Sequence, residues 1–296
     1  MPIANFALQG SLTFEQKHFE PMSHTTFQWT TSDGLTLFAQ AWAVSQPKAV
    51  VGIIHGMGEH SGRYVHVAQA LNAANISVVA YDHRGHGLSE GQKGHTPNYG
   101  FLLDGVDQLM AEMNRVAPNV PKFLFGHSMG GNVVLNYALQ RHPKVNGIIA
   151  SGPYLRLAFA PPAIQVALAK LVNGILPALG QPTNLDASGI SRDKAVVDKY
   201  LKDPLVHGRV TPRFFVEMER EAKWALDNAS KMKLPLLIYH GSADKLTSHD
   251  ASKEFASNAH GDVTWKSWEG FYHECHNEPE QQQVFALIID WINAHL

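Results

Sequence analysis

The feature that most constrains this chain is the sequence GHSMG at residues 126–130, which stands between an apolar run and a helical pattern. Residues 122–125 have the short apolar character of a buried strand, and residues 129–140 have helical spacing. A serine on a tight turn from strand to helix adopts a strained backbone conformation, so its neighbours must be small. The first N–H groups of the following helix also favour negative charge at the turn. We therefore predict that Ser128 is a nucleophile.

Short apolar and β-branched runs recur along the chain and predict further strands. They lie at residues 49–54, 76–81, 147–150, 234–239 and 263–268. Helical patterns lie at residues 63–74, 101–116 and 281–295. This alternation predicts a doubly wound, mostly parallel sheet with right-handed crossovers. Two alternating segments around Asp33-Gly34 predict an antiparallel hairpin at one sheet edge, which makes eight strands in total.

One region interrupts this alternation of strands and helices. Residues 153–226 contain no clear buried strand, and prolines divide them into helical stretches and loops. We interpret them as a helical cap inserted over the carboxyl ends of the strands of a core, which residues 25–152 and 227–296 form. The first part, residues 155–179, is strongly apolar, which indicates either core packing or a surface that binds lipid or touches a membrane. Residues 1–24 have no clear pattern, and we treat them as an N-terminal extension.

Charge and composition exclude several classes of function. The 296 residues carry a net charge of −2 without a block of like charge, which argues against a nucleic-acid partner. The single cysteine, Cys275, cannot form an internal disulfide. With neither a signal peptide nor a membrane-spanning run, we expect a cytoplasmic protein, peripheral to a membrane if the cap contacts lipid. His83 and His86 have H-x-x-H spacing, but we interpret their glycine-rich loop as a structural turn and expect neither a metal nor an organic cofactor.

Two backbone N–H groups are the expected oxyanion donors. A developing oxyanion is stabilised by two preorganised donors. When a nucleophile stands on such a turn, one donor is the N–H of the next residue, and the other comes from the loop after an earlier strand. The sequence HGMG at residues 55–58 directly follows an apolar run that ends at residue 54. We therefore predict that Met57 and Met129 donate these two N–H groups.

A serine hydroxyl needs a base to remove its proton and an acid to orient that base. With this turn, the chain order is serine, then acid, then histidine. Asp244 follows a predicted strand and is preferred to Asp250, which lies near a helical start. His273 follows the last predicted strand and is preferred to His276, three residues later. We predict that Ser128, Asp244 and His273 form a catalytic triad.

Five short sequences together carry a resemblance to a known family. They are HGMGEHSGRY at residues 55–64, DHRGHGLS at residues 82–89, GHSMGG at residues 126–131, GSAD at residues 241–244 and YH at residues 272–273. In this combination they resemble the monoacylglycerol lipases of the lysophospholipase-like branch of the serine α/β-hydrolases. The similarity runs from about residue 25 to residue 296 and includes SR and DPL sequences within the cap, at residues 191–192 and 203–205.

The resemblance implies the α/β-hydrolase fold, together with the triad and the oxyanion donors predicted above. It implies that the cap holds an apolar tunnel for an acyl chain. It also implies a polar pocket for the glycerol end of a substrate, formed by Glu59, Arg63, His276 and Tyr200. The alternative for Glu59 and Arg63 is a buried ion pair that only fixes their loop.

The expected partner is a small-molecule lipid ester. The activity that the resemblance implies is that of a monoacylglycerol lipase, which releases a fatty acid and glycerol through an acyl-enzyme on Ser128. A lysophospholipase, a carboxylesterase and a thioesterase are alternatives on the same triad. A non-catalytic binding protein is a more distant alternative, because a fold does not fix a function.

Overall fold

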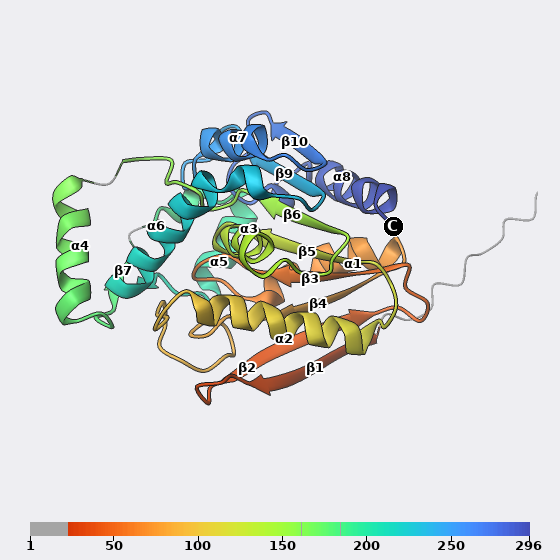
Figure 1. The fold of residues 1–296 in the computed structure, drawn as a ribbon, viewed down its shortest axis with the longest axis horizontal. Helices are drawn as coiled ribbons and strands as arrows, with labels where there is room; N and C mark the ends of the chain where they lie inside the picture. The colour runs from red at the N-terminus through yellow and green to blue at the C-terminus, as the bar shows by residue number, and fades with distance from the viewer. Residues whose placement is uncertain (1–22, 161, 184) are drawn as a thin grey trace, which may run out of the picture.

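A single eight-stranded sheet runs through the centre of the protein (Figure 1). The computed structural model describes residues 23–160, 162–183 and 185–296, so residues 1–22 of the predicted extension lie outside the described residues. The strands of this sheet are β1 Ser23–Thr30, β2 Thr36–Ala43, β3 Ala49–Ile54, β4 Ile76–Tyr81, β5 Lys122–His127, β6 Gly147–Ser151, β9 Leu236–Gly241 and β10 Val263–Trp268. Their order across the sheet is β1-β2-β4-β3-β5-β6-β9-β10.

The strand pairing confirms the predicted fold class. β1 pairs with β2 and β2 with β4 in antiparallel fashion, whereas all pairs from β4 to β10 are parallel. The predicted hairpin therefore forms one edge of a mostly parallel sheet. The carboxyl ends of parallel strands share one edge, which is where ligands bind in sheets of this type. The loops after β3, β5, β9 and β10 consequently meet at that edge.

Helices cover both faces of the sheet because nearly all its central strands are apolar on both sides. One face packs against α2 Gly100–Val116, α3 Met129–Arg141 and α7 His249–Asn258, whose buried residues join one hydrophobic core. The other face packs against α1 Val65–Ala73 and α8 Gln281–Ala294, which belong to a second core. The two cores fix the sheet between two helical layers, so the loops at its edge have a rigid support.

The chain between β6 and β9 forms a separate group of short elements. They are α4 Ala163–Ile175, β7 Gln181–Pro182, α5 Lys194–Lys202, β8 Arg209–Val210 and α6 Pro212–Asp227. Thr211 caps α6 by accepting a hydrogen bond from the Phe214 N–H, and Pro212 stands at its first turn, where the missing N–H costs nothing. α6 packs on α3, and α4 packs on α6, so Figure 1 shows α4 at the far end of the molecule from the sheet.

None of the helices within the described ranges has both the length and the apolar character needed to cross a membrane.

Candidate active site

Ser128 stands at the turn between β5 and α3 in a strained backbone conformation. Its φ of 54° and ψ of −115° are rare for a residue with a side chain. Three backbone hydrogen bonds hold the turn: the Ser128 N–H donates to the Ser151 carbonyl at 2.9 Å, and the Ser128 carbonyl accepts from Asn132 and Tyr154 at 3.0 and 2.8 Å. The surrounding structure therefore fixes the position from which the serine side chain leaves the turn.

The two glycines of the turn are required by the close approach of neighbouring backbone. A Cβ atom at Gly126 would lie 2.1 Å from the Gly130 carbonyl oxygen, and one at Gly130 would lie 2.0 Å from the Ile54 carbonyl oxygen. Both distances are far below van der Waals contact. The GxSxG spacing thus follows from packing the start of α3 against the ends of β3 and β5.

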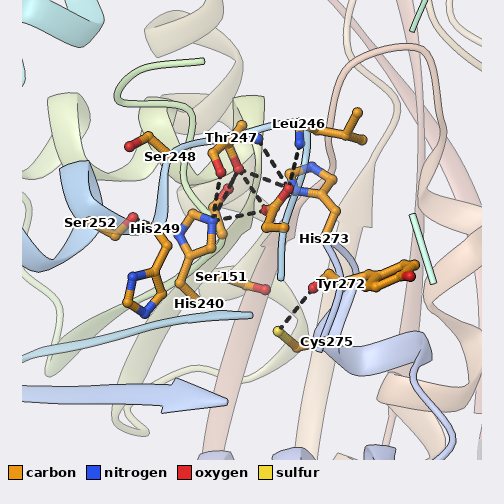
Figure 2. Close-up of polar contacts among 12 residues, drawn as sticks. Ser151, His240, Leu246, Thr247, Ser248, His249, Ser252, Tyr272, His273 and Cys275 are labelled. Atoms are coloured by element: carbon orange, nitrogen blue, oxygen red, sulfur yellow. Dashed lines mark hydrogen bonds and ion pairs between the residues drawn. The ribbon is translucent and has the colours of Figure 1, made fainter. Parts of the chain in front are cut away.

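Asp244 and His273 meet at the same edge of the sheet. Asp244 lies in the loop after β9 and His273 in the loop after β10, and the His273 Nδ1 is 2.6 Å from the Asp244 Oδ2. The other carboxylate oxygen of Asp244 accepts from the Leu246 and Thr247 N–H groups at 2.7 and 3.1 Å. Figure 2 shows Leu246, Thr247 and His273 close together around this group of contacts. The rival Asp250 instead lies in the first turn of α7 with its side chain exposed.

The electrostatics of this pair favour an ionised acid and a basic histidine. Burial raises the pKa of Asp244, but the nearby His273 and His240 outweigh it and hold that pKa well below its ordinary value. Burial lowers the pKa of His273, but the Asp244 carboxylate outweighs this effect and raises it. At neutral pH the pair can therefore stabilise a proton gained by His273.

Two further side chains bind the Asp244 carboxylate. The His240 Nε2 lies 2.9 Å from the Asp244 Oδ2, and the Thr247 hydroxyl donates to the same oxygen at 3.0 Å. Burial lowers the pKa of His240, so its ring is neutral, and it must carry its proton on Nε2 because a carboxylate only accepts. Its Nδ1 then accepts from the Ser252 hydroxyl at 2.8 Å.

A cavity of about 580 Å³ opens beside Ser128. Ser128 and His273 line it, as do both predicted oxyanion residues, Met57 and Met129. Met129 is the first residue of α3, whose first N–H groups have no partner inside the helix. The loop that contains Met57 runs close to the serine: a Cβ atom built at the neighbouring Gly56 would lie only 3.3 Å from the Ser128 Cβ.

Much of the remaining cavity wall is apolar and comes from the chain between β6 and β9. Its side chains include Leu157, Val166, Leu185, Val210, Phe215 and Met218. A largely apolar wall that also contains polar groups is typical of a site for a small amphipathic molecule.

Comparison with known proteins identifies the family. The model of the family described as serine aminopeptidase, S33, matches residues 45–280. The chain belongs to this family. It is therefore a serine hydrolase, and its mostly parallel eight-stranded sheet agrees with the solved structures of other α/β-hydrolases.

Similar proteins include named lipases. The chain is 34% identical over 267 residues to a monoacylglycerol lipase of Mycolicibacterium smegmatis, covering 89% of this chain and 95% of that one. The crystal structure of a monoacylglycerol lipase from Paleococcus ferrophilus superposes with a TM-score of 0.81 at 33% identity, covering 88% of this chain and 99% of that one. An uncharacterized abhydrolase domain-containing protein of Dictyostelium discoideum is 35% identical over 93% of this chain, which spans only 30% of that longer protein.

In this S33 hydrolase, the four predicted head-group residues do not all face the cavity. Glu59 and Tyr200 line it, whereas Arg63 and His276 are not among its lining residues. His276 is buried, with its ring stacked 5.1 Å from that of Tyr64. Glu274, which the sequence analysis did not single out, lines the cavity beside His273.

Arg63 joins two buried carboxylates. One of its terminal nitrogens donates to Glu59 at 2.6 Å, and both donate to the two carboxylate oxygens of Glu274 at 2.7 and 2.8 Å. Its guanidinium also lies 4.8 Å from the ring centroid of Tyr200. Burial raises the pKa of Glu59, but Arg63 outweighs this effect and lowers it, so Glu59 is ionised. The buried ion pair considered from the sequence is thus present and includes a third member.

Sequence reasoning could have found one of the missed residues more easily than the other. His240 directly follows the predicted strand 234–239 and lies four residues before Asp244, so its position alone was a signal. Glu274 adjoins His273 in sequence, but its contact with Arg63 joins residues 211 positions apart. No local pattern predicts a contact of that length.

Proposed function

We propose that this serine hydrolase is of the monoacylglycerol lipase type and cleaves the ester bond of a monoacylglycerol into a fatty acid and glycerol. The observation that carries the proposal is the cavity, in which Ser128 and His273 share the lining with many apolar side chains and with a polar group of Glu59, Tyr200 and Glu274, which we call the polar end. The acyl chain fits the apolar wall, and the glycerol fits the polar end. The names of the similar lipases support the same substrate class.

In the first step, the Ser128 hydroxyl attacks the ester carbonyl while His273 takes its proton. Asp244 holds the histidine through the 2.6 Å contact with Nδ1, which leaves Nε2 free to take the serine proton. The Met57 and Met129 N–H groups stabilise the oxyanion. His273 then returns the proton to the glycerol oxygen, which leaves, and the acyl group stays on Ser128 as an ester.

In the second step, water releases the fatty acid. His273 removes a proton from the water as it attacks the acyl-enzyme, and the same two N–H groups stabilise the second oxyanion. The proton then passes from His273 to the Ser128 oxygen, which restores the free enzyme.

The chain between β6 and β9, which corresponds to the predicted insertion 153–226, acts as a cap that covers the acyl chain. Val166 and Ala169 of α4 line the cavity, as do Phe214 and Phe215 of α6. Burying an acyl chain contributes about 0.8 kcal/mol per methylene, so a long chain gains much of its binding free energy there. The cap therefore favours long-chain over short-chain esters.

At the polar end, Glu59 and Tyr200 contact the glycerol. Arg63 acts from behind, by holding the Glu59 carboxylate in place through the 2.6 Å hydrogen bond. His276 supports the same end by packing on Tyr64, whose hydroxyl donates to Glu59 at 2.7 Å.

The outer face of α4 contacts a lipid surface from which the substrate enters. Four large apolar side chains of this helix are exposed: Ile164, Leu168, Leu171 and Ile175. Their exposed fractions range from 57% for Leu168 to 79% for Ile164. Exposing such an apolar patch to water is unfavourable in free energy, and a patch of this kind is typical of an interaction surface. Replacing Leu168 and Leu171 by serine should reduce cosedimentation with neutral phospholipid vesicles without lowering turnover of a water-soluble ester. Equal vesicle binding by this variant and the wild type would contradict the lipid contact.

A substrate panel tests the activity. We expect the wild-type protein to hydrolyse long-chain monoacylglycerols with a higher kcat/KM than lysophospholipids, acyl thioesters or p-nitrophenyl butyrate. A preference for the short ester would favour a carboxylesterase, and a preference for the lysophospholipid a lysophospholipase. Failure of a fluorophosphonate to label the protein would favour a non-catalytic binding protein.

A further inference from the structure

Apart from the proposed base His273, whose pKa is raised, the charge on the described residues that line the cavity is of one sign. The charged carboxylates among its described lining residues belong to Glu59, Asp186, Asp203 and Glu274, and neither lysine nor arginine occurs among those described residues. Burial lowers the pKa of His127 and of His207 to about 4, so neither of these lining histidines is charged at neutral pH. A negatively charged group that enters this cavity therefore meets no lysine or arginine among the described lining residues, and the one lining histidine with a raised pKa is the proposed base, His273.

Glu274 is the acidic residue nearest in sequence to the proposed base, His273. Its side chain is buried, and both of its oxygens are bound by Arg63, with a further hydrogen bond from the Asn277 amide at 2.7 Å. Its N–H donates to the Ile190 carbonyl at 2.7 Å, which fixes the backbone against the chain between β6 and β9. The carboxylate is therefore held in one position at the polar end.

The charges at this end do not cancel. Glu59 and Glu274 contribute two negative charges, and Arg63, which lies behind them, contributes one positive charge. One net negative charge therefore remains in a buried setting, where it is screened far less than it would be in water. Without Glu274, the Glu59–Arg63 pair would be neutral.

We propose that Glu274 determines head-group specificity by giving the polar end a net negative charge, so that the enzyme accepts esters of neutral or cationic alcohols and rejects esters of anionic ones. This inference rests on the proposed function and deepens it. An alcohol such as glycerol or choline leaves without meeting a like charge. A glycerophosphate head group brings its negative charge beside Glu59 and Glu274, and the described lining offers no lysine or arginine to bind it.

The same carboxylate acts on His273. The groups facing this histidine are Asp244, Glu274 and Glu59, which are negative, and the His127 and His240 rings, which are neutral. Burial lowers the pKa of His273, whereas Asp244 first, and Glu274 and Glu59 after it, raise that pKa. Neutralising Glu274 should therefore lower the pKa of the base and move the acidic limb of the kcat/KM profile to lower pH.

The first measurement compares the turnover of three esters by the wild-type protein. All three carry the same single acyl chain and are presented in the same non-ionic mixed micelles. They are a monoacylglycerol, an acylcholine and a lysophosphatidic acid. We expect the kcat/KM of the anionic ester to be lower than that of the monoacylglycerol by about tenfold or more, as for two like charges facing each other across a partly solvated site. Equal turnover of all three esters would overturn the inference but leave the proposed function intact. Absence of monoacylglycerol hydrolysis would instead overturn the proposed function.

The second measurement compares Glu274→Gln with Glu274→Asp and with Glu112→Gln. Gln is nearly isosteric and can still accept a hydrogen bond from Arg63. Glu112 pairs with Arg115 on the surface of α2, so its variant removes the same charge far from the head-group end. We expect Glu274→Gln to reduce the ratio of kcat/KM for the monoacylglycerol to kcat/KM for the anionic ester by about tenfold. The acidic limb of its kcat/KM profile should move to lower pH. The Asp and Glu112 variants should keep the wild-type ratio.

A folded Glu274→Gln variant with the wild-type ratio and the wild-type pH profile would overturn the inference. If that variant does not fold, competitive inhibition of the wild type by dodecyl phosphate and by dodecyltrimethylammonium decides instead. The cation should bind more tightly than the anion, and tighter binding of the phosphate would contradict an anion-rejecting site.

Discussion

At the scale of single residues, the Asp244 carboxylate is the most heavily bound group of the site. Two N–H groups bind one of its oxygens, and His240, His273 and Thr247 bind the other. Each donor stabilises the charged form and limits the directions in which the carboxylate can turn. The consequence is an acid that stays ionised while it holds the histidine in one orientation.

Removing the hydrogen bond that His240 donates should change both the pKa of the base, His273, and the stability of the protein. In His240→Leu, Asp244 loses a buried hydrogen bond, which should cost about 1–3 kcal/mol of unfolding free energy. The less stabilised carboxylate attracts a proton on His273 more strongly, so the acidic limb of kcat/KM should move to higher pH. Urea unfolding and a pH–rate profile measure the two effects.

His240→Gln retains a side-chain N–H donor and should restore the pH profile toward that of the wild type. His249→Gln serves as a control, because His249 binds Ser267 rather than Asp244. An unchanged acidic limb in a folded His240→Leu protein would show that His240 has only a structural role.

At the scale of elements, the turn between β5 and α3 couples the fold to the site. The helix can begin directly after the serine only because its first turn lies against the end of β3, where Gly130 meets the Ile54 carbonyl oxygen. The sheet order, with β3 beside β5, brings these two strand ends together. The strained serine is thus a consequence of how these elements pack.

Gly130→Ala should therefore disrupt both stability and activity. Its Cβ meets backbone atoms on another strand and can be accommodated only by moving α3, so we expect a loss of more than about 2 kcal/mol in unfolding free energy. Gly174→Ala is the matched control, because Gly174 lies within α4 with open space around its Cβ position. That variant should gain about 0.5–1 kcal/mol from helix propensity. Similar urea midpoints for the two variants would contradict this account of the turn.

The sequence predicted elements and strand-end residues better than contacts between distant parts. Ser128, Asp244 and His273 each follow a strand end in the chain, so local pattern and strand order were enough to bring them to one edge of the sheet. The path of the chain between β6 and β9 depends instead on packing, as when α4 meets α6 rather than the sheet. The turn of Arg63 toward Glu274, away from the cavity, has the same origin and was not predictable from residue types.

At the scale of the whole molecule, buried histidines link stability to pH. Burial lowers the pKa of His55, His83, His86, His127, His207 and His276 below the ordinary 6.5. Unfolding exposes these rings, which then bind protons at their ordinary pKa. Between that value and the lowered values, the unfolded chain binds more protons than the folded one. His273, with its raised pKa, opposes this effect but is a single residue.

Stability should consequently fall as the pH decreases below about 6.5 and continue to fall toward pH 4, the approximate pKa of His127 and His207. Asp244 and Glu59 add to the loss only at lower pH, because their folded pKa values lie below their ordinary ones. Urea midpoints measured from pH 7.5 to pH 4.5 test this trend, and His83→Gln should make it shallower. A midpoint that stays constant or rises between pH 7 and pH 5 would contradict the linkage.

The central claim is that Ser128 carries the acyl group of a monoacylglycerol. The most direct measurement is the initial rate of fatty acid release from a long-chain monoacylglycerol by the wild type and by Ser128→Ala, with equal urea midpoints verifying that both are folded. We expect the variant to lose about 10⁴-fold or more in kcat, since the members of a triad act as a unit. A Ser128→Ala protein that keeps near-wild-type turnover would contradict the account.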